Sequence, residues 1–307
     1  MDGQGRKLKN ILIAIDFSEN SDFAITRAIE IAKNTNANLT FLHVVQKKYL
    51  DNFADSTLKN LLPKGLYLTT EEYKDELVQE KIRSLSRYKL NIKHIVIPKG
   101  NPAVKILQYV RKNKIDLLIM GAHGKYSIRD TFVGTTAEYI AQRTLCPVLI
   151  VKNLSKNPYR KILVPVDFSS TSKAAFNYSL QLFPNANIRL MHVGDYEYED
   201  LLKKEEKEEH IPKNKIIKMR KAILFYLDNK MKKFIKGRNK QLGKNSYSIQ
   251  LGYPGPLIIN ESKKINSDLI IMGTQGHGRL YYLFIGSVAN WVLTETNKDI
   301  LLVPPKS

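Results

Sequence analysis

The strongest constraint on the fold of this 307-residue chain is a glycine pattern that occurs once in each half. The pattern is glycine, two residues, glycine, nine residues, and then glycine followed by threonine or serine. Its members are Gly121, Gly124, Gly134 and Thr135 in the first half, and Gly273, Gly276, Gly286 and Ser287 in the second. Gly273 lies 152 positions after Gly121, which is about half the chain. Two copies at one offset indicate an internal duplication.

The duplication extends well beyond the glycines. The segment from Asp16 to Ser18, Asp-Phe-Ser, returns as Asp167 to Ser169, and His43-Val44 returns as His192-Val193. A Gly-X-Pro triplet recurs at Gly100 and Gly252, and the runs Asp-Leu-Leu-Ile-Met-Gly and Asp-Leu-Ile-Ile-Met-Gly lead into the two glycine patterns. Two large copies predict two tandem domains, residues 1–153 and 154–307, rather than a solenoid of short repeats.

Composition places the chain among globular proteins. The hydrophobic fraction is 43% and the charged fraction is 25%, as expected for domains that bury a core. No run approaches the roughly 18 to 20 apolar residues that span a bilayer, and the first ten residues are polar. The single cysteine, Cys146, has no internal partner and precedes a proline at a strand start, so we expect it to be buried and unreactive. These features predict a cytoplasmic protein without a membrane partner.

The net charge of +20 is the unusual bulk property. Such an excess can mark a protein that binds nucleic acid. However, the excess is divided almost evenly, +9 up to Asn153 and +11 after it. The densest stretch, residues 203–240, mixes four glutamates with its lysines, as a solvated helix face does. Nucleic-acid binding is therefore not the favoured interpretation.

Short apolar runs alternate with segments of helical period in each half. Such runs indicate strands buried on both faces of a parallel sheet. In the first half the expected strands are 11–16, 39–45, 92–97, 117–120 and 148–151, and the expected helices are 22–33, 71–88, 102–113 and 135–143. Ser18 and Ser21 are both suitable N-caps for the first helix. The order predicts an α/β fold of two tandem doubly wound domains, each a five-stranded parallel sheet flanked by helices. Five strands per repeat disfavour an eight-stranded barrel.

The repeated polar and glycine residues fall at one edge of each predicted sheet. Ligands of doubly wound sheets bind beyond the carboxyl ends of the strands, where the strand order reverses. Asp16 ends the first strand and Gly121 ends the fourth, so the two face each other if these strands are neighbours. Glycines let backbone N–H groups approach phosphate oxygens, and Thr135 and Ser287 open helices whose N-termini attract anions. The pattern is neither a Walker P-loop nor a Rossmann fingerprint, because it follows strand four and contains no Gly-Lys-Ser/Thr.

These motifs resemble the nucleotide signature of the universal stress protein family, whose domains have an adenine nucleotide alpha-hydrolase-like fold. The Asp-Phe-Ser segments and the closing run Cys146 to Val151 also resemble that family. The resemblance covers nearly the whole chain. It implies an ATP-binding stress-response protein with one site per domain, and a pseudo-dimer in which the final strands, 148–151 and 300–303, pair across the two domains. A further homodimer is an open alternative.

The resemblance also implies a set of ligand residues. Asp16 and Asp167 would lie at the ribose and metal side, Val44 and Val193 at the adenine, and the glycines with Thr135 and Ser287 at the phosphates. The implied ligand is ATP, either alone or together with Mg²⁺. Asp16 and Asp167 could instead only cap the following helices, and His43 and His192 are better interpreted as half-buried structural residues.

Two alternatives stay open for the function. The chain could be a slow ATP hydrolase, but no catalytic residue, metal-ligand cluster or arginine finger can be assigned from the sequence. It could also be an adaptor that does not depend on nucleotide, particularly if the second site has lost its ligand. In that case we expect the first domain to hold the single nucleotide.

Overall fold

The computed structural model describes residues 8–44, 79, 83, 85, 88–97, 100–123, 133–154, 157–194, 213–238, 242–243, 246–276 and 285–305. The chain divides into two compact units, Arg6–Lys156 and Asn157–Ser307, the second joined by Met1–Gly5. We refer to them as the first and second domains. Gly124 and most of the helix expected over 71–88 lie outside the described residues.

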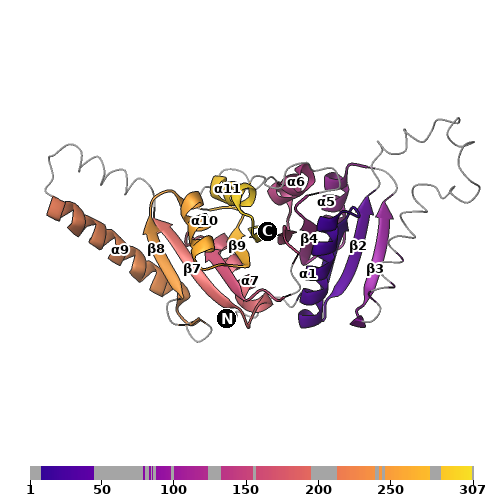
Figure 1. Ribbon diagram of the computed structural model, residues 1–307, viewed down its shortest axis with the longest axis horizontal. Coiled ribbons are helices and arrows are strands. Elements are labelled where there is room, and N and C mark those ends of the chain that lie inside the picture. Colours follow the sequence, from indigo (N-terminus) through magenta and orange to yellow (C-terminus); the bar gives the residue numbers. More distant parts are fainter. Residues whose placement is uncertain are drawn as a thin grey trace, which may run out of the picture. The chain divides into compact units, whose positions relative to one another are not determined.

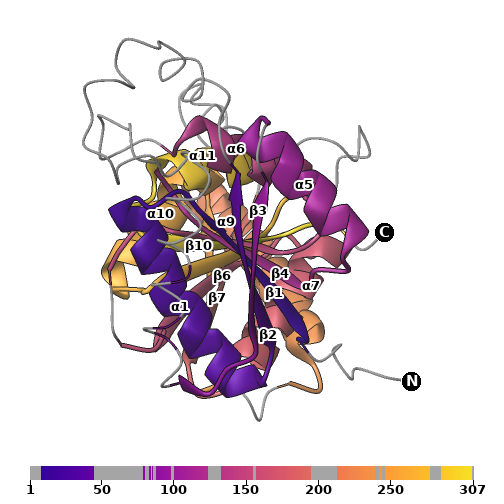
Figure 2. The same ribbon diagram turned by 90° about the vertical axis from the view of Figure 1, so that its right-hand side faces the viewer.

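The first domain is a parallel sheet with the strand order β3-β2-β1-β4-β5. Figure 2 shows α1 on one side of the strands and α5 on the other. The predicted doubly wound topology is confirmed, including the neighbouring first and fourth strands. Its elements are β1 (Asn10–Ile15), α1 (Glu19–Thr35), β2 (Asn38–Val44), β3 (Ile92–Ile97), α5 (Pro102–Lys112), β4 (Leu117–Gly121), α6 (Thr135–Arg143) and β5 (Val148–Val151).

The second domain repeats this order as β10-β9-β6-β7-β8, also parallel. Helix α7 packs on β6 and β9, whereas α10 packs on β7 and against α11. Most of its elements are labelled in Figure 1, and β6 and β10 are labelled in Figure 2. They are β6 (Lys161–Pro165), α7 (Ser170–Leu182), β7 (Asn187–Gly194), α9 (Lys213–Ile235), β8 (Tyr247–Leu251), α10 (Pro254–Lys264), β9 (Leu269–Gly273), α11 (Ser287–Glu295) and β10 (Asp299–Val303).

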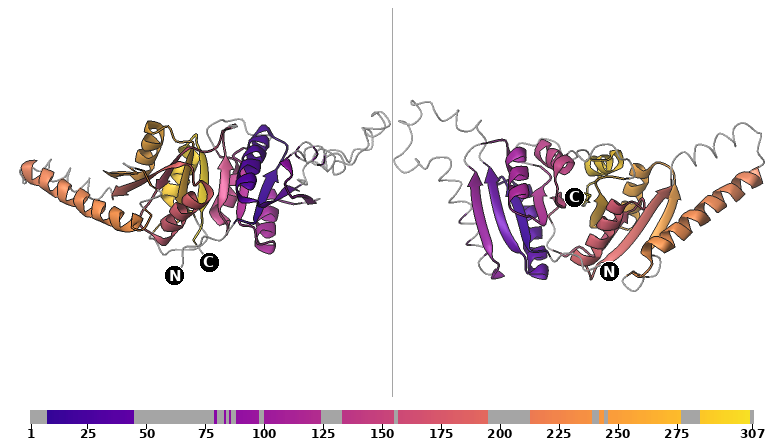
Figure 3. Two further views of the ribbon diagram at one scale, coloured as in Figure 1. Left: turned by 90° about the horizontal axis from the view of Figure 1, so that it is seen from below. Right: turned by 180° about the vertical axis from the view of Figure 1, so that it is seen from behind.

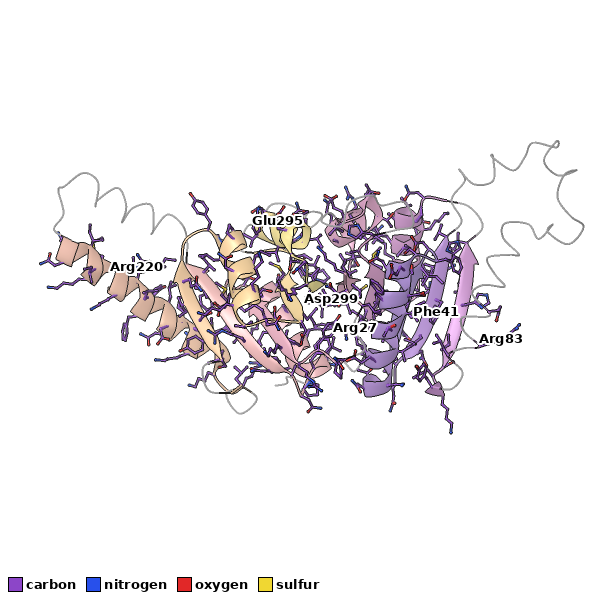
Figure 4. All side chains as sticks on the ribbon, in the orientation of Figure 1. Arg27, Phe41, Arg83, Arg220, Glu295 and Asp299 are labelled. Atoms are coloured by element: carbon purple, nitrogen blue, oxygen red, sulfur yellow. The ribbon has the colours of Figure 1, made fainter. Side chains whose placement is uncertain are left out.

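The central strands form the core of each domain. Every residue of β4 before Gly121, and every residue of β5, is buried. Phe41 of β2, labelled in Figure 4, is fully buried and is among the largest such side chains. Continuous burial of this kind follows from having helices on both faces of the sheet, and it explains why the strand sequences are unbroken apolar runs rather than alternating ones.

Side-chain hydrogen bonds to the backbone fix the first strand of both domains in the same way. Asp116 Oδ2 accepts hydrogen bonds from the N–H groups of Lys9 and Asn10 at 2.9 and 3.0 Å, which fastens the start of β1 to β4. Asp268 does the same for the start of β6, at 2.8 and 2.9 Å. Ser18 rather than Ser21 is the N-cap of α1, so this helix begins before the predicted boundary.

Two further features stabilise the second domain. Asp299 at the start of β10, labelled in Figure 4, is buried and accepts a 2.5 Å hydrogen bond from the Tyr159 hydroxyl. The long helix α9 lies beside β8, as both views of Figure 3 show. Helix α9 begins at Lys213. The four glutamates of the basic stretch 203–240 lie before this position and outside the described residues, so they do not belong to the described face of α9.

Candidate functional site

A cavity of about 430 Å³ opens at the carboxyl edge of the second-domain sheet. Its size is typical of sites for small organic ligands. All six residues that the sequence singled out in this domain line it: Asp167, Val193, Gly273, Gly276, Gly286 and Ser287. The structure therefore brings together residues from β7, β9, the turn after β6 and the start of α11. These segments are up to 120 positions apart in the sequence.

The rest of the cavity lining is mostly apolar. The apolar side chains come from β6, β7, β9, α10, α11 and adjoining turns. They were not predicted from the sequence, because pockets collect residues that carry no local motif. They are Pro165, Val166, Met191, Pro254, Ile258, Met272, Ile285, Val288 and Ala289, and Ser172, Thr274 and Gln275 complete the lining. A lining that combines apolar side chains with backbone polar groups suits a ligand that has both a flat apolar ring and charged oxygens.

The glycines stand where a side chain would collide with the site. A Cβ atom on Gly276 would lie 2.7 Å from Asp167 Oδ2, so this glycine lets the carboxylate and the loop backbone approach closely. A Cβ atom on Gly273 would lie 2.8 Å from Thr171 Cγ2, where α7 passes the end of β9. Both positions require glycine for close approach and not for a left-handed backbone, because neither has a positive φ.

The N-terminus of α11 faces the cavity with its first three residues, Ser287, Val288 and Ala289. Its N-cap, Gly286, has no side chain to accept the N–H groups of the first turn, and that turn has no acidic residue. The Gly286 N–H donates to Thr274 O at 2.6 Å, which fixes the helix start against the end of β9. The first-turn N–H groups and the positive end of the helix dipole therefore form a surface suited to an anion.

The acidic residue of each site is held by its own turn. Asp167 Oδ1 accepts the Ser169 N–H at 3.0 Å. In the first domain, Asp16 Oδ1 accepts the Ser18 N–H at 3.1 Å, the Ser18 hydroxyl at 2.6 Å and the Ser21 hydroxyl at 2.5 Å. The serines, and not the aspartates, cap the helices that follow. The alternative that the aspartates serve only as helix caps is therefore wrong.

The first domain has the same arrangement at the end of its sheet. Ser18 Oγ lies 3.5 Å from His123 O, so the turn after β1 is next to the loop after β4. Gly134 N–H donates to Ala122 O at 2.7 Å, the counterpart of the Gly286 contact. Gly134 is also the N-cap of α6, with Thr135 as its first residue. A Cβ atom on Gly121 would lie 2.7 Å from the backbone carbon of Asn20. Val44 ends β2, and Gly124 lies outside the described residues.

Three further expectations concern groups outside the ligand set. His43 and His192 are 4% and 8% exposed, so they are buried rather than half-buried. Cys146 is buried as expected, and its burial raises the pKa of the thiol to about 11, so that the unreactive thiol dominates at neutral pH. Among the described residues, no group of three or more His, Cys, Asp or Glu side chains could hold a metal ion.

Fold and site together define a class of protein: two tandem, parallel, doubly wound α/β domains, each with a glycine-rich loop between its fourth strand and a helix N-terminus. A profile of the universal stress protein family matches residues 7–152 and 158–304, which is nearly the whole chain. The chain belongs to the universal stress protein family, as a tandem two-domain member. Membership of this family supports a role in the stress response.

Individual relatives match one domain at a time. The universal stress protein YxiE of Bacillus subtilis is 28% identical over 154 residues, which cover 46% of this chain and 97% of the relative. The universal stress protein MJ0531 of Methanocaldococcus jannaschii is 30% identical over 151 residues, covering 48% and 84%. About half of this chain, the length of one domain, thus corresponds to most of each relative.

A solved structure extends the likeness to both domains. A universal stress protein from Archaeoglobus fulgidus aligns with a TM-score of 0.67 and 19% identity, over 97% of this chain and 96% of that one. At this identity the alignment shows the fold alone. None of the helices in the described segments combines the length and the apolar character needed to cross a membrane.

Proposed function

We propose that this chain is a regulatory stress-response protein that binds ATP, with one adenine-nucleotide site in each domain. The cavity of the second domain carries the proposal, because it is lined by all six residues that the nucleotide signature selects there. Nucleotide occupancy would then change the conformation or the assembly of the protein.

The two kinds of lining group match the two ends of the ligand. The adenine would contact apolar side chains such as Met191, Pro254 and Ile258, with the Val193 backbone hydrogen-bonded to its edge. The phosphates would lie against the glycines and the N-terminus of α11, where backbone N–H groups and a helix dipole attract negative charge. Asp167 Oδ2 lies next to Gly276, so Asp167 would stand at the ribose and metal side, between the adenine and the phosphates.

Asp167 is the single carboxylate among the described residues that line the cavity, which also limits what a metal ion could do. Mg²⁺ prefers octahedral oxygen ligands and often takes most of them from phosphates and water. Asp167 fits this pattern as one protein ligand, so Mg²⁺ would arrive with ATP and not occupy a site of its own. Slow hydrolysis of ATP is the alternative activity. A phosphate-release assay on the wild type, Asp16→Ala and Asp167→Ala would detect it, and a rate unaffected by both changes would indicate a contaminant.

The first domain supports the proposal through its matching geometry. The turn that holds Asp16, the close approach at Gly121 and the contact of Gly134 with Ala122 all have counterparts in the second domain. We therefore propose a second ATP site at Asp16, Val44, Gly121, Gly124, Gly134 and Thr135. The pseudo-dimer of the two domains, a homodimer of the chain and the cytoplasmic location stay predictions.

Calorimetric titration with ATP, with and without Mg²⁺, tests the proposal. We expect about two nucleotides per wild-type chain, one for Gly286→Asp or Gly134→Asp, and none for the double variant, since each new carboxylate would lie where phosphates bind. Gly243→Asp is the matched control, because a Cβ atom at this exposed glycine meets no atom within 4 Å. A wild-type protein that gives no binding heat and carries no nucleotide through purification would refute the proposal.

A further inference from the structure

The residue after each site aspartate has a strained backbone. Phe17 follows Asp16 with a φ of 62°, and Phe168 follows Asp167 with a φ of 67°. A bulky side chain with positive φ is a rare and unfavourable conformation that persists only when surrounding contacts enforce it. Its presence at the same place in both copies indicates that the turn needs it.

The strained turn determines where the carboxylate points. It folds the chain back so that the Ser169 N–H reaches Asp167 Oδ1 at 3.0 Å. The other carboxylate oxygen then lies next to Gly276 at the edge of the cavity, 2.7 Å from the position of a Cβ atom on that residue. The φ of Phe168 thus controls an atom that faces the candidate ligand, although Phe168 itself does not line the cavity.

A buried histidine holds the chain on both sides of each aspartate. His192 Nδ1 lies 2.8 Å from the carbonyl oxygen of Val166, the residue before Asp167, and therefore carries the hydrogen and donates it. The same ring packs on Phe168, the residue after Asp167, with a centroid distance of 4.2 Å. His43 repeats both contacts in the first domain, at 2.8 Å from Ile15 O and 4.8 Å from the Phe17 ring.

In the second domain, helix α9 adds a further contact. The Phe234 ring lies edge to face with Phe168 at 5.7 Å, and Lys230 Nζ lies 4.8 Å from the centre of the Phe168 ring. Phe234 also stacks on Phe176 of α7 at 6.0 Å. Helix α9 contributes no residue to the cavity lining, yet it packs on the residue whose backbone orients the site carboxylate.

We infer that Phe168 is a positioning residue for Asp167, and that His192 and Phe234 keep it in its strained conformation, so that α9 influences ligand binding in a cavity it does not touch. The inference rests on the proposed function for its effect on ATP binding. Its effect on the turn itself can be measured without any ligand. In the first domain, Phe17 and His43 have the corresponding roles.

The ligand-free test is amide hydrogen exchange at Ser169, whose N–H is bonded to Asp167 Oδ1. We expect Phe234→Ala to accelerate this exchange about tenfold or more, while the amide of Ile270 in the fully buried core of β9 changes less. Phe225→Ala is the matched control on the same helix, because Phe225 is 67% exposed. Equal acceleration at Ser169 and Ile270 would show a merely structural role and overturn the inference, as would no change at Ser169. Phe234→Leu provides the same comparison if the alanine variant does not fold.

A second comparison uses position 168 directly. Phe168→Ala removes the ring contacts but retains the penalty for positive φ, whereas glycine adopts this φ readily. We expect Ser169 to exchange faster in Phe168→Ala than in Phe168→Gly; equal rates would contradict a role for the strained turn.

ATP affinity is then measured in variants that also carry Gly134→Asp. This change should abolish binding in the first domain, so that the measured affinity is that of the second site. Phe234→Ala should weaken binding about five- to tenfold and Phe225→Ala should not, and equal affinities would overturn the effect on binding. If the wild type binds no ATP, the proposed function fails, but the exchange measurements still decide whether Phe168 positions Asp167.

Discussion

Asp167 Oδ2 lies 2.7 Å from the point that a Cβ atom on Gly276 would occupy. The carboxylate that follows β6 and the loop that follows β9 therefore approach each other as closely as a glycine permits. This contact joins the two most distinctive motifs of the repeat, the Asp-Phe-Ser segment and the glycine pattern, at the edge of one cavity.

Replacing Gly276 by alanine should displace the Asp167 carboxylate without unfolding the domain, because the end of an aspartate side chain can rotate away. We expect ATP affinity at the second site to fall by about tenfold, roughly 1.4 kcal/mol, with little change in the midpoint of urea unfolding. Calorimetry in the Gly134→Asp background measures the affinity. Gly243→Ala, where a Cβ atom meets nothing within 4 Å, is the control. Unchanged affinity would show that the position of the carboxylate is unimportant.

The corresponding change at Gly121 should act on stability instead. Its Cβ atom would lie 2.7 Å from the backbone carbon and 2.8 Å from the backbone oxygen of Asn20, and backbone atoms within α1 cannot easily move. We expect Gly121→Ala to lower the free energy of unfolding by about 1 to 3 kcal/mol, as overpacking does in well-packed cores. Gly273→Ala should cost less, because it meets the Thr171 side chain first. Urea unfolding of the two variants tests this order, and the reverse order would contradict it.

An ion pair in the second domain replaces a neutral pair of the first. Arg189 Nε lies 2.7 Å from Glu261 Oε1, and Glu261 is 1% exposed. Thr40 and Tyr109 occupy the corresponding positions of the first domain, and both are neutral at pH 7. We expect Arg189→Met to destabilise the domain by about 2 to 4 kcal/mol, since it leaves a buried carboxylate without its cation.

The double variant Arg189→Thr/Glu261→Tyr reproduces the first-domain pair at these positions. It should lose less stability than Arg189→Met alone, because neither residue is then a buried charge. Chemical denaturation of the three proteins provides the comparison. A double variant less stable than the single one would indicate that the rest of the second domain has adapted to the ion pair.

Alkaline pH should loosen the contact between α9 and β8. Burial and the neighbouring Asp228 carboxylate raise the pKa of Tyr247 from 10.0 to about 12, and its hydroxyl donates to Asp228 Oδ1 at 2.7 Å. A pKa that is higher in the folded protein stabilises it below the pKa of the unfolded state, and this contribution disappears as pH rises from about 10 to about 12.

The fall in unfolding free energy over this pH range should therefore be smaller in Tyr247→Phe than in the wild type. Tyr226→Phe is the control. Tyr226 is 59% exposed on α9, the helix that carries Asp228, and among the described residues it forms no hydrogen bond with Asp228. Identical pH profiles for the wild type and Tyr247→Phe would contradict the assignment.

The fold was largely predictable because apolar runs such as Leu117–Gly121 are buried on both sheet faces and therefore show no alternation. The duplication also allowed each element to be identified twice. The cavity walls were not predictable, since Pro254 and Ile258 reach the site only through the packing of α10 on β7. The strain at Phe168 was equally hidden, because a positive φ at an aromatic residue opposes its local preference and depends on contacts from His192 and Phe234.

The most direct test of the account is nuclear magnetic resonance of the ¹⁵N-labelled wild-type chain titrated with ATP and Mg²⁺. If the second-domain cavity holds the nucleotide, the amide resonances of Gly273, Gly276, Gly286 and Ser287 should shift in a saturable manner, and that of Gly243 should not. The corresponding first-domain amides, Gly121, Gly134 and Thr135, should shift as well. If none of these amide resonances shifts at millimolar ATP, the proposal that the two domains bind ATP is contradicted.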